Sequence, residues 1–443
     1  MSSGKSGALD LGSTTAKDSR SITSATTAEV SSIDYLLQKC LYRTATRALL
    51  THAKLRLILV MTELALTPTT SASGVTVWVR CHSLLKLPTV IQKLTLLAGT
   101  IKYFDAWHND SSGEPVKMPN VVCCHEQDDG ILWKHTNFRT QNAVVTRSRI
   151  LVLQTIITVS NYEYIFAFHF GQDATISFEV RATGILSTVP MSLDTKEKVP
   201  YGTHVAPGVL APYHQHLFSL RIDPALDGHS NSLVVEESKP IAANDPSNPY
   251  GVGYISEQTT IEHEGGHDLD FTKNRVFKIV NENVTNPITK TPVGFKLLPA
   301  YSQMLLAHPE SYHAKRSEFG QHAVWVTRYQ DDDHFPSGKY TMQSPGGDGI
   351  ASAISKRAAA NDPVSTLVRN SDIVVWHTFG STHNPRIEDW PVMPNEKMMV
   401  SLKPVNFFNG NPGLDVAPST QEKNKSVLFI EETPANDCCQ AKL

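Results

Sequence analysis

Histidines two residues apart on a strand can bind a single metal ion. The sequence contains such a pair, His214-Gln215-His216, followed by the strand-like run 217–222. Side chains at i and i+2 of a strand share a face, so both imidazoles can reach one ion while Gln215 points away. Among 18 histidines, His383 is the candidate third ligand. Three imidazoles suit Cu(II) or Zn(II), and a hydrogen-bonded pair of histidines is the alternative interpretation.

A second pair of histidines has the spacing of a zinc-peptidase helix. In His263-Glu264-Gly265-Gly266-His267 the two imidazoles would lie one helical turn apart, and Glu264 could activate water. The two interior glycines would cost a helix about 2 kcal/mol relative to alanine. Asp268 and Asp270 also leave no apolar face to bury. We therefore predict a polar surface loop, and a zinc metallopeptidase through His263, Glu264 and His267 is a distant alternative.

From Gly99 onward, short runs of strand-like sequence are separated by Gly, Pro, Asn and Asp. This pattern predicts that strands position the histidines. The clearest runs are 162–170 and, after a turn at 171–173, 175–182. Apolar and polar side chains alternate along the second run, which is the period of a half-buried antiparallel hairpin. Repeated strands without intervening helical patterns predict an all-β fold, a large antiparallel β-sandwich.

Composition divides the chain into three parts. Residues 1–100 contain 11 Lys and Arg against 5 Asp and Glu, whereas the remainder contains 29 against 38. We predict an irregular or partly helical leader over 1–98, because its first thirty-odd residues are rich in Ser, Thr and Ala and 33–66 has helix-like apolar spacings. The β-domain is predicted over 99–417, and 418–443 reads as a polar tail.

Charge and hydropathy exclude several classes of partner. A net charge of -3 gives no chain-wide basic field of the kind that binds nucleic acid. The longest apolar run, 55–66, is interrupted by Arg56 and Glu63 and is shorter than the roughly 20 residues of a membrane-spanning helix. Six cysteines, four of them in adjacent pairs, are too few for a disulfide scaffold. We expect no nucleic-acid and no membrane partner.

A third group of residues is Thr158-Val159-Ser160-Asn161-Tyr162-Glu163-Tyr164, which by itself is a strand with two tyrosines on one face. This heptad resembles the cofactor motif of the copper amine oxidases, in which the first tyrosine becomes topaquinone. The family's other signatures follow in order, at His214-Gln215-His216 and at 382–394, which contains His383. The resemblance implies that the chain forms the family's catalytic β-sandwich domain and that it is a homodimer. In character the sequence is most similar to the fungal peroxisomal members.

The resemblance also implies roles for individual residues. Tyr162 would become the topaquinone (TPQ) that condenses with a primary amine as a Schiff base, and Asn161 would position its ring. His214, His216 and His383 would bind Cu(II). The implied enzyme is a copper-dependent primary-amine oxidase, which deaminates primary amines with O2 to aldehyde, ammonia and hydrogen peroxide.

A second cation site is implied as well. Asp223 and Asp372 match two of its ligands in the family, and carboxylate oxygens suit calcium or manganese. Surface aspartates at strand ends are the alternative interpretation.

The chain departs from the family at the general base. The family's aspartate precedes the cofactor tyrosine in a segment that this sequence does not match. We disfavour Asp105 as a substitute, because 99–103 matches a family segment that already follows the base. The base therefore stays unassigned, and residues 1–98 resemble no family domain. We expect a truncated or misassembled product with impaired activity, and the alternative is a catalytically inactive, copper-binding dimeric β-domain.

The last three residues, Ala441-Lys442-Leu443, are a variant of the Ser-Lys-Leu peroxisomal address. We expect recognition by the peroxisomal import receptor and a peroxisomal location, with the cytoplasm as the alternative. A peroxide-producing oxidase belongs with catalase.

Overall fold

The structure, a computed structural model, describes residues 53–65, 75–77, 101–195, 197–339, 344–360 and 366–420. Strands predominate among them, and all of the strand pairings described are antiparallel. The predicted all-β fold class is therefore confirmed. The predicted peroxisomal address and most of the predicted leader and tail lie outside the described residues.

The larger sheet has ten strands in the order β13-β12-β15-β16-β19-β7-β6-β5-β4-β3. Their bounds are Tyr254–Thr260 (β13), Ser232–Pro240 (β12), Val276–Thr285 (β15), Pro292–Leu298 (β16), Val392–Val405 (β19), Ile176–Ile185 (β7), Tyr162–Gly171 (β6), Ala143–Val159 (β5), Pro115–Thr136 (β4) and Ile101–Asn109 (β3).

The second sheet has six strands in the order β14-β17-β18-β11-β1-β2. They span Gly265–His267 (β14), Val324–Arg328 (β17), Ile373–His383 (β18), His214–Leu226 (β11), Ala53–Ala65 (β1) and Val75–Val77 (β2). A small sheet of β8 (Val189–Pro190), β10 (Val209–Pro212) and β9 (Gly202–Ala206) leads into β11.

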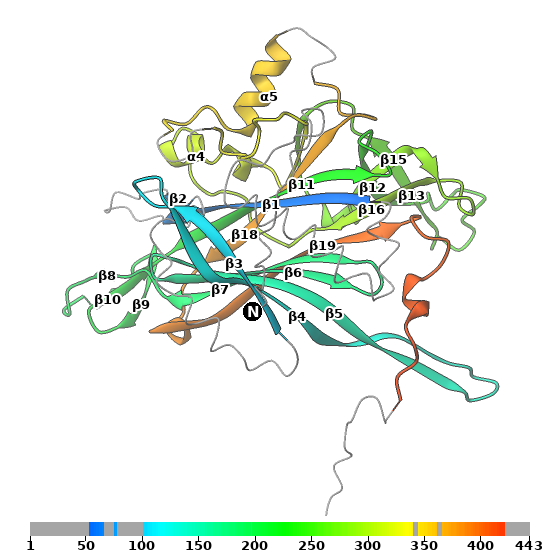
Figure 1. The fold of residues 1–443 in the computed structure, drawn as a ribbon. Coiled ribbons are helices and arrows are strands. Elements are labelled where there is room, and N and C mark those ends of the chain that lie inside the picture. Colours follow the sequence, from blue (N-terminus) through cyan, green and yellow to red (C-terminus); the bar gives the residue numbers. More distant parts are fainter. Residues whose placement is uncertain are drawn as a thin grey trace, which may run out of the picture.

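Two α-helices, α4 (Tyr312–Arg316) and α5 (Ile350–Ala359), lie on the outer side of the six-stranded sheet (Figure 1). Short 3-10 helices occupy Phe271–Lys273, Glu318–Gln321, Ile387–Asp389 and Pro412–Asp415. Ile350 of α5 packs in a small cluster with Trp376 of β18. None of the helices within the described residues has the length and apolar character needed to cross a bilayer.

The main hydrophobic core lies between the two large sheets. Phe166 on β6 contacts Phe218 on β11 with ring centroids 6.2 Å apart, and Phe218 contacts Phe379 on β18 at 5.6 Å. Buried side chains from both sheets belong to the same cluster. The two sheets therefore pack face to face, as the predicted β-sandwich requires.

The predicted hairpin is present as β6 and β7, which pair from Tyr162↔Gly184 to Phe170↔Ile176. The prediction that only one face is buried was wrong. Ser177 and Glu179, on the polar face of β7, are 8% and 1% exposed. Lys397 lies 2.6 Å from the Glu179 carboxylate, and Arg181 is also paired with it. A partner on the neighbouring strand β19 and another on β7 itself thus allow a carboxylate to be buried where alternation alone predicts a solvated side chain.

One part of the leader also differs from the sequence prediction. The helix-like spacing over 33–66 predicts helical structure, but Ala53–Ala65 forms strand β1. It pairs antiparallel with the whole length of β11. The apolar run is nearly continuous, and a pattern of this kind does not separate a helix from an interior strand, so the available edge of β11 decides between them.

Candidate metal centre

The register between two neighbouring strands brings three histidines together. β11 and β18 pair so that His214 lies directly opposite His383, and His216 follows two residues later on the same face of β11. The three imidazoles are 3%, 2% and 6% exposed. Each offers a ring nitrogen, and these three atoms lie within 4.8 Å of one another. The predicted triad is therefore assembled by the fold, with its side chains directed into the sandwich.

In each histidine, the ring nitrogen that is not part of this group of three lies near an oxygen atom. Nδ1 of His214 donates to the Pro212 carbonyl at 2.9 Å, and Nδ1 of His216 lies 2.7 Å from the Tyr164 hydroxyl. Nε2 of His383 lies 3.6 Å from Oδ2 of Asp389. This arrangement leaves Nε2 of His214, Nε2 of His216 and Nδ1 of His383 for an ion. Oxygen partners behind metal-binding histidines fix the ring orientation and tautomer.

Burial favours the neutral form of two of the three histidines, His214 and His216. It lowers the pKa of His214 to about 4, against the opposing effect of the Pro212 carbonyl. Burial also lowers the pKa of His216 well below its ordinary value, and repulsion from the neighbouring histidines adds to this effect. The neutral imidazole is the form that coordinates a metal, so His214 and His216 are in a form that can bind an ion near pH 7.

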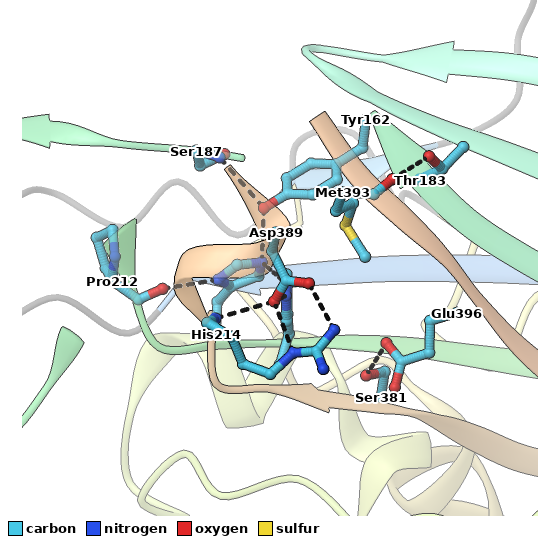
Figure 2. A network of polar contacts seen from close by, with 11 residues as sticks. Tyr162, Thr183, Ser187, Pro212, His214, Ser381, Asp389, Met393 and Glu396 are labelled. Atoms are coloured by element: carbon cyan, nitrogen blue, oxygen red, sulfur yellow. Dashed lines mark hydrogen bonds and ion pairs between the residues drawn. The ribbon is translucent and has the colours of Figure 1, made fainter. Parts of the chain in front are cut away.

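A buried tyrosine lies against the triad. Tyr162, the first residue of β6, is 0% exposed, and its hydroxyl lies 2.9 Å from Nε2 of His214. The same oxygen accepts the backbone N–H of Ser187 at 3.2 Å (Figure 2). Asn161 precedes Tyr162 in the β5–β6 turn, where its carbonyl accepts the Ile185 N–H at 2.8 Å. Two backbone N–H groups, at the end of β7 and just after it, therefore help to fix the position of Tyr162.

The profile of the family described as "Copper amine oxidase, enzyme domain" matches residues 91–423. The chain belongs to this family. "Copper amine oxidase 1" of Aspergillus niger is 48% identical over 343 residues, which cover 77% of this chain and 49% of the relative. The "Peroxisomal primary amine oxidase" of Pichia angusta is 41% identical over 339 residues, covering 74% and 48% of the two chains.

The crystal structure of a copper-containing benzylamine oxidase from Hansenula polymorpha is similar, with a TM-score of 0.74 and 42% identity. The match covers 82% of this chain and 56% of that one. The chain spans about half the length of the curated relatives it matches. Membership of the copper amine oxidase family implies copper and a quinone cofactor, and three buried imidazoles are donors that fit copper.

Asp389 is a neighbour of the copper amine oxidase triad that the sequence analysis did not single out. It is 4% exposed and lies in the 3-10 helix that follows β18. Its Oδ1 accepts from Nη2 of Arg386 at 2.9 Å, and its Oδ2 accepts the Arg386 backbone N–H at 2.9 Å. The signal was present in 382–394, where this carboxylate lies six residues after His383. Its proximity to Nε2 of His383 becomes visible only when the chain turns back after β18.

Each of the two predicted second-site aspartates lies beside a basic side chain. Asp223 is 3% exposed and lies 3.2 Å from Nη1 of Arg221, which is equally buried. Asp372 is half-buried and lies 3.8 Å from Nδ1 of His229. Among the described residues, the triad is the only group of three His, Cys, Asp or Glu side chains close enough to share an ion. A second cation at Asp223 and Asp372 stays a prediction.

The zinc-peptidase spacing does not form a metal site. Glu264 is buried and paired with Arg357 at 2.7 Å, and His263 lies 3.1 Å from the Thr366 hydroxyl. His267 belongs to the short strand β14, so the predicted surface loop is in part a strand at the edge of the six-stranded sheet. The helix required to place His263 and His267 on one ion is replaced by extended backbone.

Asp105, the disfavoured base, lies on β3 at the edge of the ten-stranded sheet. β3 is three strands from β6, which corresponds to about 14 Å at the usual spacing between strands. The Asp105 carboxylate lies 2.7 Å from Nζ of Lys117, and this pairing, with the Asn120 backbone N–H, lowers the pKa of Asp105. The side chain is thus occupied by a surface ion pair.

Proposed function

We propose that this chain is the catalytic domain of a copper-dependent primary-amine oxidase, which converts primary amines and O2 to aldehyde, ammonia and hydrogen peroxide. The observation that carries the proposal is the Tyr162 hydroxyl, buried 2.9 Å from a nitrogen of the histidine triad. A tyrosine held at this distance is placed for oxidation by a copper ion bound to His214, His216 and His383.

Copper and the quinone derived from Tyr162 supply the two-electron oxidation of the amine and the return of those electrons to O2. The chain's own residues prepare the site for this chemistry. The Ser187 N–H donates to the Tyr162 oxygen and holds it beside the triad. The complete burial of Tyr162 and Tyr164 keeps bulk water away from the triad. Asn161 is proposed to limit the orientation of the ring.

We also propose that turnover by this chain is slow. The sequence contains no match to the segment that carries the family's base, and Asp105 lies several strands from Tyr162. A positioned base contributes about 10²- to 10⁴-fold to the rate of proton transfer. Quinone formation depends on copper and Tyr162, so it is expected to survive this loss.

Three further features belong to the same proposal. Relatives from Pichia angusta and Nicotiana tabacum are named peroxisomal, which supports import through Ala441-Lys442-Leu443. A homodimer and a calcium or manganese ion at Asp223 and Asp372 follow from the family resemblance.

The decisive experiment is a visible spectrum of copper-loaded, aerated protein before and after phenylhydrazine. We expect a coloured adduct in the wild-type protein and none in Tyr162→Phe. Tyr250→Phe is the matched control, because Tyr250 is 86% exposed and has no role in the proposed site. A folded, copper-loaded wild type without an adduct would refute the proposal. That result, together with copper-dependent stabilisation, would instead identify an inactive copper-binding domain.

A further inference from the structure

The strand that carries two of the three metal ligands is an interior strand. β11 pairs with β18 on one edge, and β18 carries the third ligand. On its other edge β11 pairs with β1 over all 13 residues of each strand, from Ala53↔Leu226 to Ala65↔His214. Figure 1 shows β1 lying along β11. β1 also lies before residue 91, where the family match begins.

β11 has a particular need for this partner. Twelve of its 13 residues are buried, so its backbone has little access to water. Buried N–H and C=O groups must find partners within the protein, and an unpaired group costs free energy. β18 can satisfy only the groups that point to its own side of β11. The groups on the opposite side depend on β1.

The end of β1 near the triad is supported most strongly. Glu63 and Ala65 occupy the positions opposite His216 and His214. At the same end β2 pairs with β1 from Met61↔Val77 to Glu63↔Val75. The ligand-bearing end of β11 therefore has two successive strands behind it, whereas elsewhere β1 is the last strand of the sheet among the described residues.

We propose that β1 is a positioning element for the metal centre, supplied by a segment outside the family match. Its ladder with β11 fixes the backbone from which His214 and His216 project. Copper affinity therefore depends on backbone hydrogen bonds made by residues 53–65. This inference rests on the proposed function, because it assumes that the triad binds copper.

A proline scan in the middle of β1 tests the proposal. In an antiparallel ladder, N–H groups point to the partner strand at every second residue. β2 pairs with β1 only at residues 61–63, so at positions 57–60 the N–H groups that have a strand partner are those directed to β11. Proline at Leu57, Ile58, Leu59 and Val60 should therefore weaken copper binding at alternate positions. Copper affinity should fall about tenfold or more at one alternate pair of positions, as expected for the loss of a buried hydrogen bond, and little at the other.

Alanine at the same four positions is the matched control, because it removes the side chain and keeps the N–H. Copper affinity is measured by competition with a chelator. Wild-type affinity in all four proline variants would overturn the proposal, as would an alanine profile that reproduces the proline profile. If the wild-type chain binds no copper, the proposed function fails instead.

Amide hydrogen exchange of the wild-type protein provides a test that no variant's folding can obscure. Alternate amides of β1 and the facing amides of β11 should exchange slowly in the copper-loaded chain. Their exchange should accelerate when a chelator removes the ion. Uniformly fast exchange along 53–65 in the copper-loaded protein would show that β1 does not support the site.

Discussion

Gly184 and Tyr162 lie opposite each other in the ladder between β7 and β6, and a Cβ atom at position 184 would lie 2.9 Å from the Tyr162 Cα. The same atom would lie 2.5 Å from the Asn161 carbonyl oxygen. Gly184 has φ +110°, a conformation that favours glycine. The position of Tyr162 thus depends on the absence of a side chain at residue 184 of the neighbouring strand.

Gly184→Ala is therefore expected to displace Tyr162 and slow formation of the phenylhydrazine-reactive cofactor. Gly113→Ala is the matched control, because Gly113 also has positive φ, +87°, but has nothing within 4 Å of a Cβ atom. Both variants should lose about 1–2 kcal/mol of stability from backbone strain. Only Gly184→Ala should also slow the appearance of adduct in a time course after copper addition, and equal rates would contradict the proposed packing.

Asp389→Asn is expected to weaken copper binding by about 10- to 100-fold, the usual effect of losing the oxygen partner of a metal-binding histidine. The carboxylate lies 3.6 Å from Nε2 of His383, whose Nδ1 lies 3.3 Å from Nε2 of His214. Affinity is measured by chelator competition, with the melting temperature of the copper-free protein alongside. Glu388→Gln, at an exposed neighbour, should change neither quantity. Unchanged affinity in Asp389→Asn would remove Asp389 from the site.

The two histidine pairs should behave differently when metal content is measured. His216→Ala should abolish stoichiometric copper binding, because it removes a ligand that is 2% exposed and faces the other two imidazoles. His263→Ala and His267→Ala should retain the copper content of the wild type, since these residues do not share an ion with the triad. The measurement is metal analysis after gel filtration. A loss of metal in the His263 or His267 variant would reopen the zinc-peptidase alternative.

The stability of the fold should fall in mild acid because of His377, a buried residue outside the triad. Burial lowers its pKa to about 4, and Nδ1 lies 2.9 Å from the Ala323 carbonyl while Nε2 accepts the Ala300 N–H. The unfolded chain binds a proton near pH 6.5 and the folded chain does not, so stability decreases as the pH falls from 6.5 toward 4. The expected contribution between pH 6.5 and 5 is about 2 kcal/mol.

Urea unfolding at a series of pH values measures this effect. His377→Gln should be less stable at pH 7 but should show a shallower decline below pH 6.5. The exposed His135→Gln should follow the wild-type curve. A His377→Gln curve parallel to that of the wild type would assign the acid sensitivity to other groups.

The sequence was most informative where an element is local. The hairpin of β6 and β7 followed from alternation and a turn only a few residues long, and both the pairing and its apolar face were confirmed. The close placement of His214 and His383 was harder to foresee from residues alone, because they are 169 positions apart and meet only through the β11–β18 register. The family resemblance, and not the alternation of side chains, supported the prediction that His383 joins His214 and His216.

The features that local patterns missed depend on distant partners. Glu179 is buried because Lys397, on a strand far along the chain, lies beside it. Residues 53–65 form a strand because an edge of β11 is available to them. Period and propensity describe one segment at a time, so they do not contain these contacts.

The direct opposition of His214 and His383 has a consequence for folding. A slip in the register between β11 and β18 would move the two imidazoles apart, and a slip of one residue would send one of them to the other face of the sheet. Only the native alignment of these distant segments creates a high-affinity site. Copper binding would therefore select for the native register, because it stabilises correctly paired chains and leaves misaligned chains without metal.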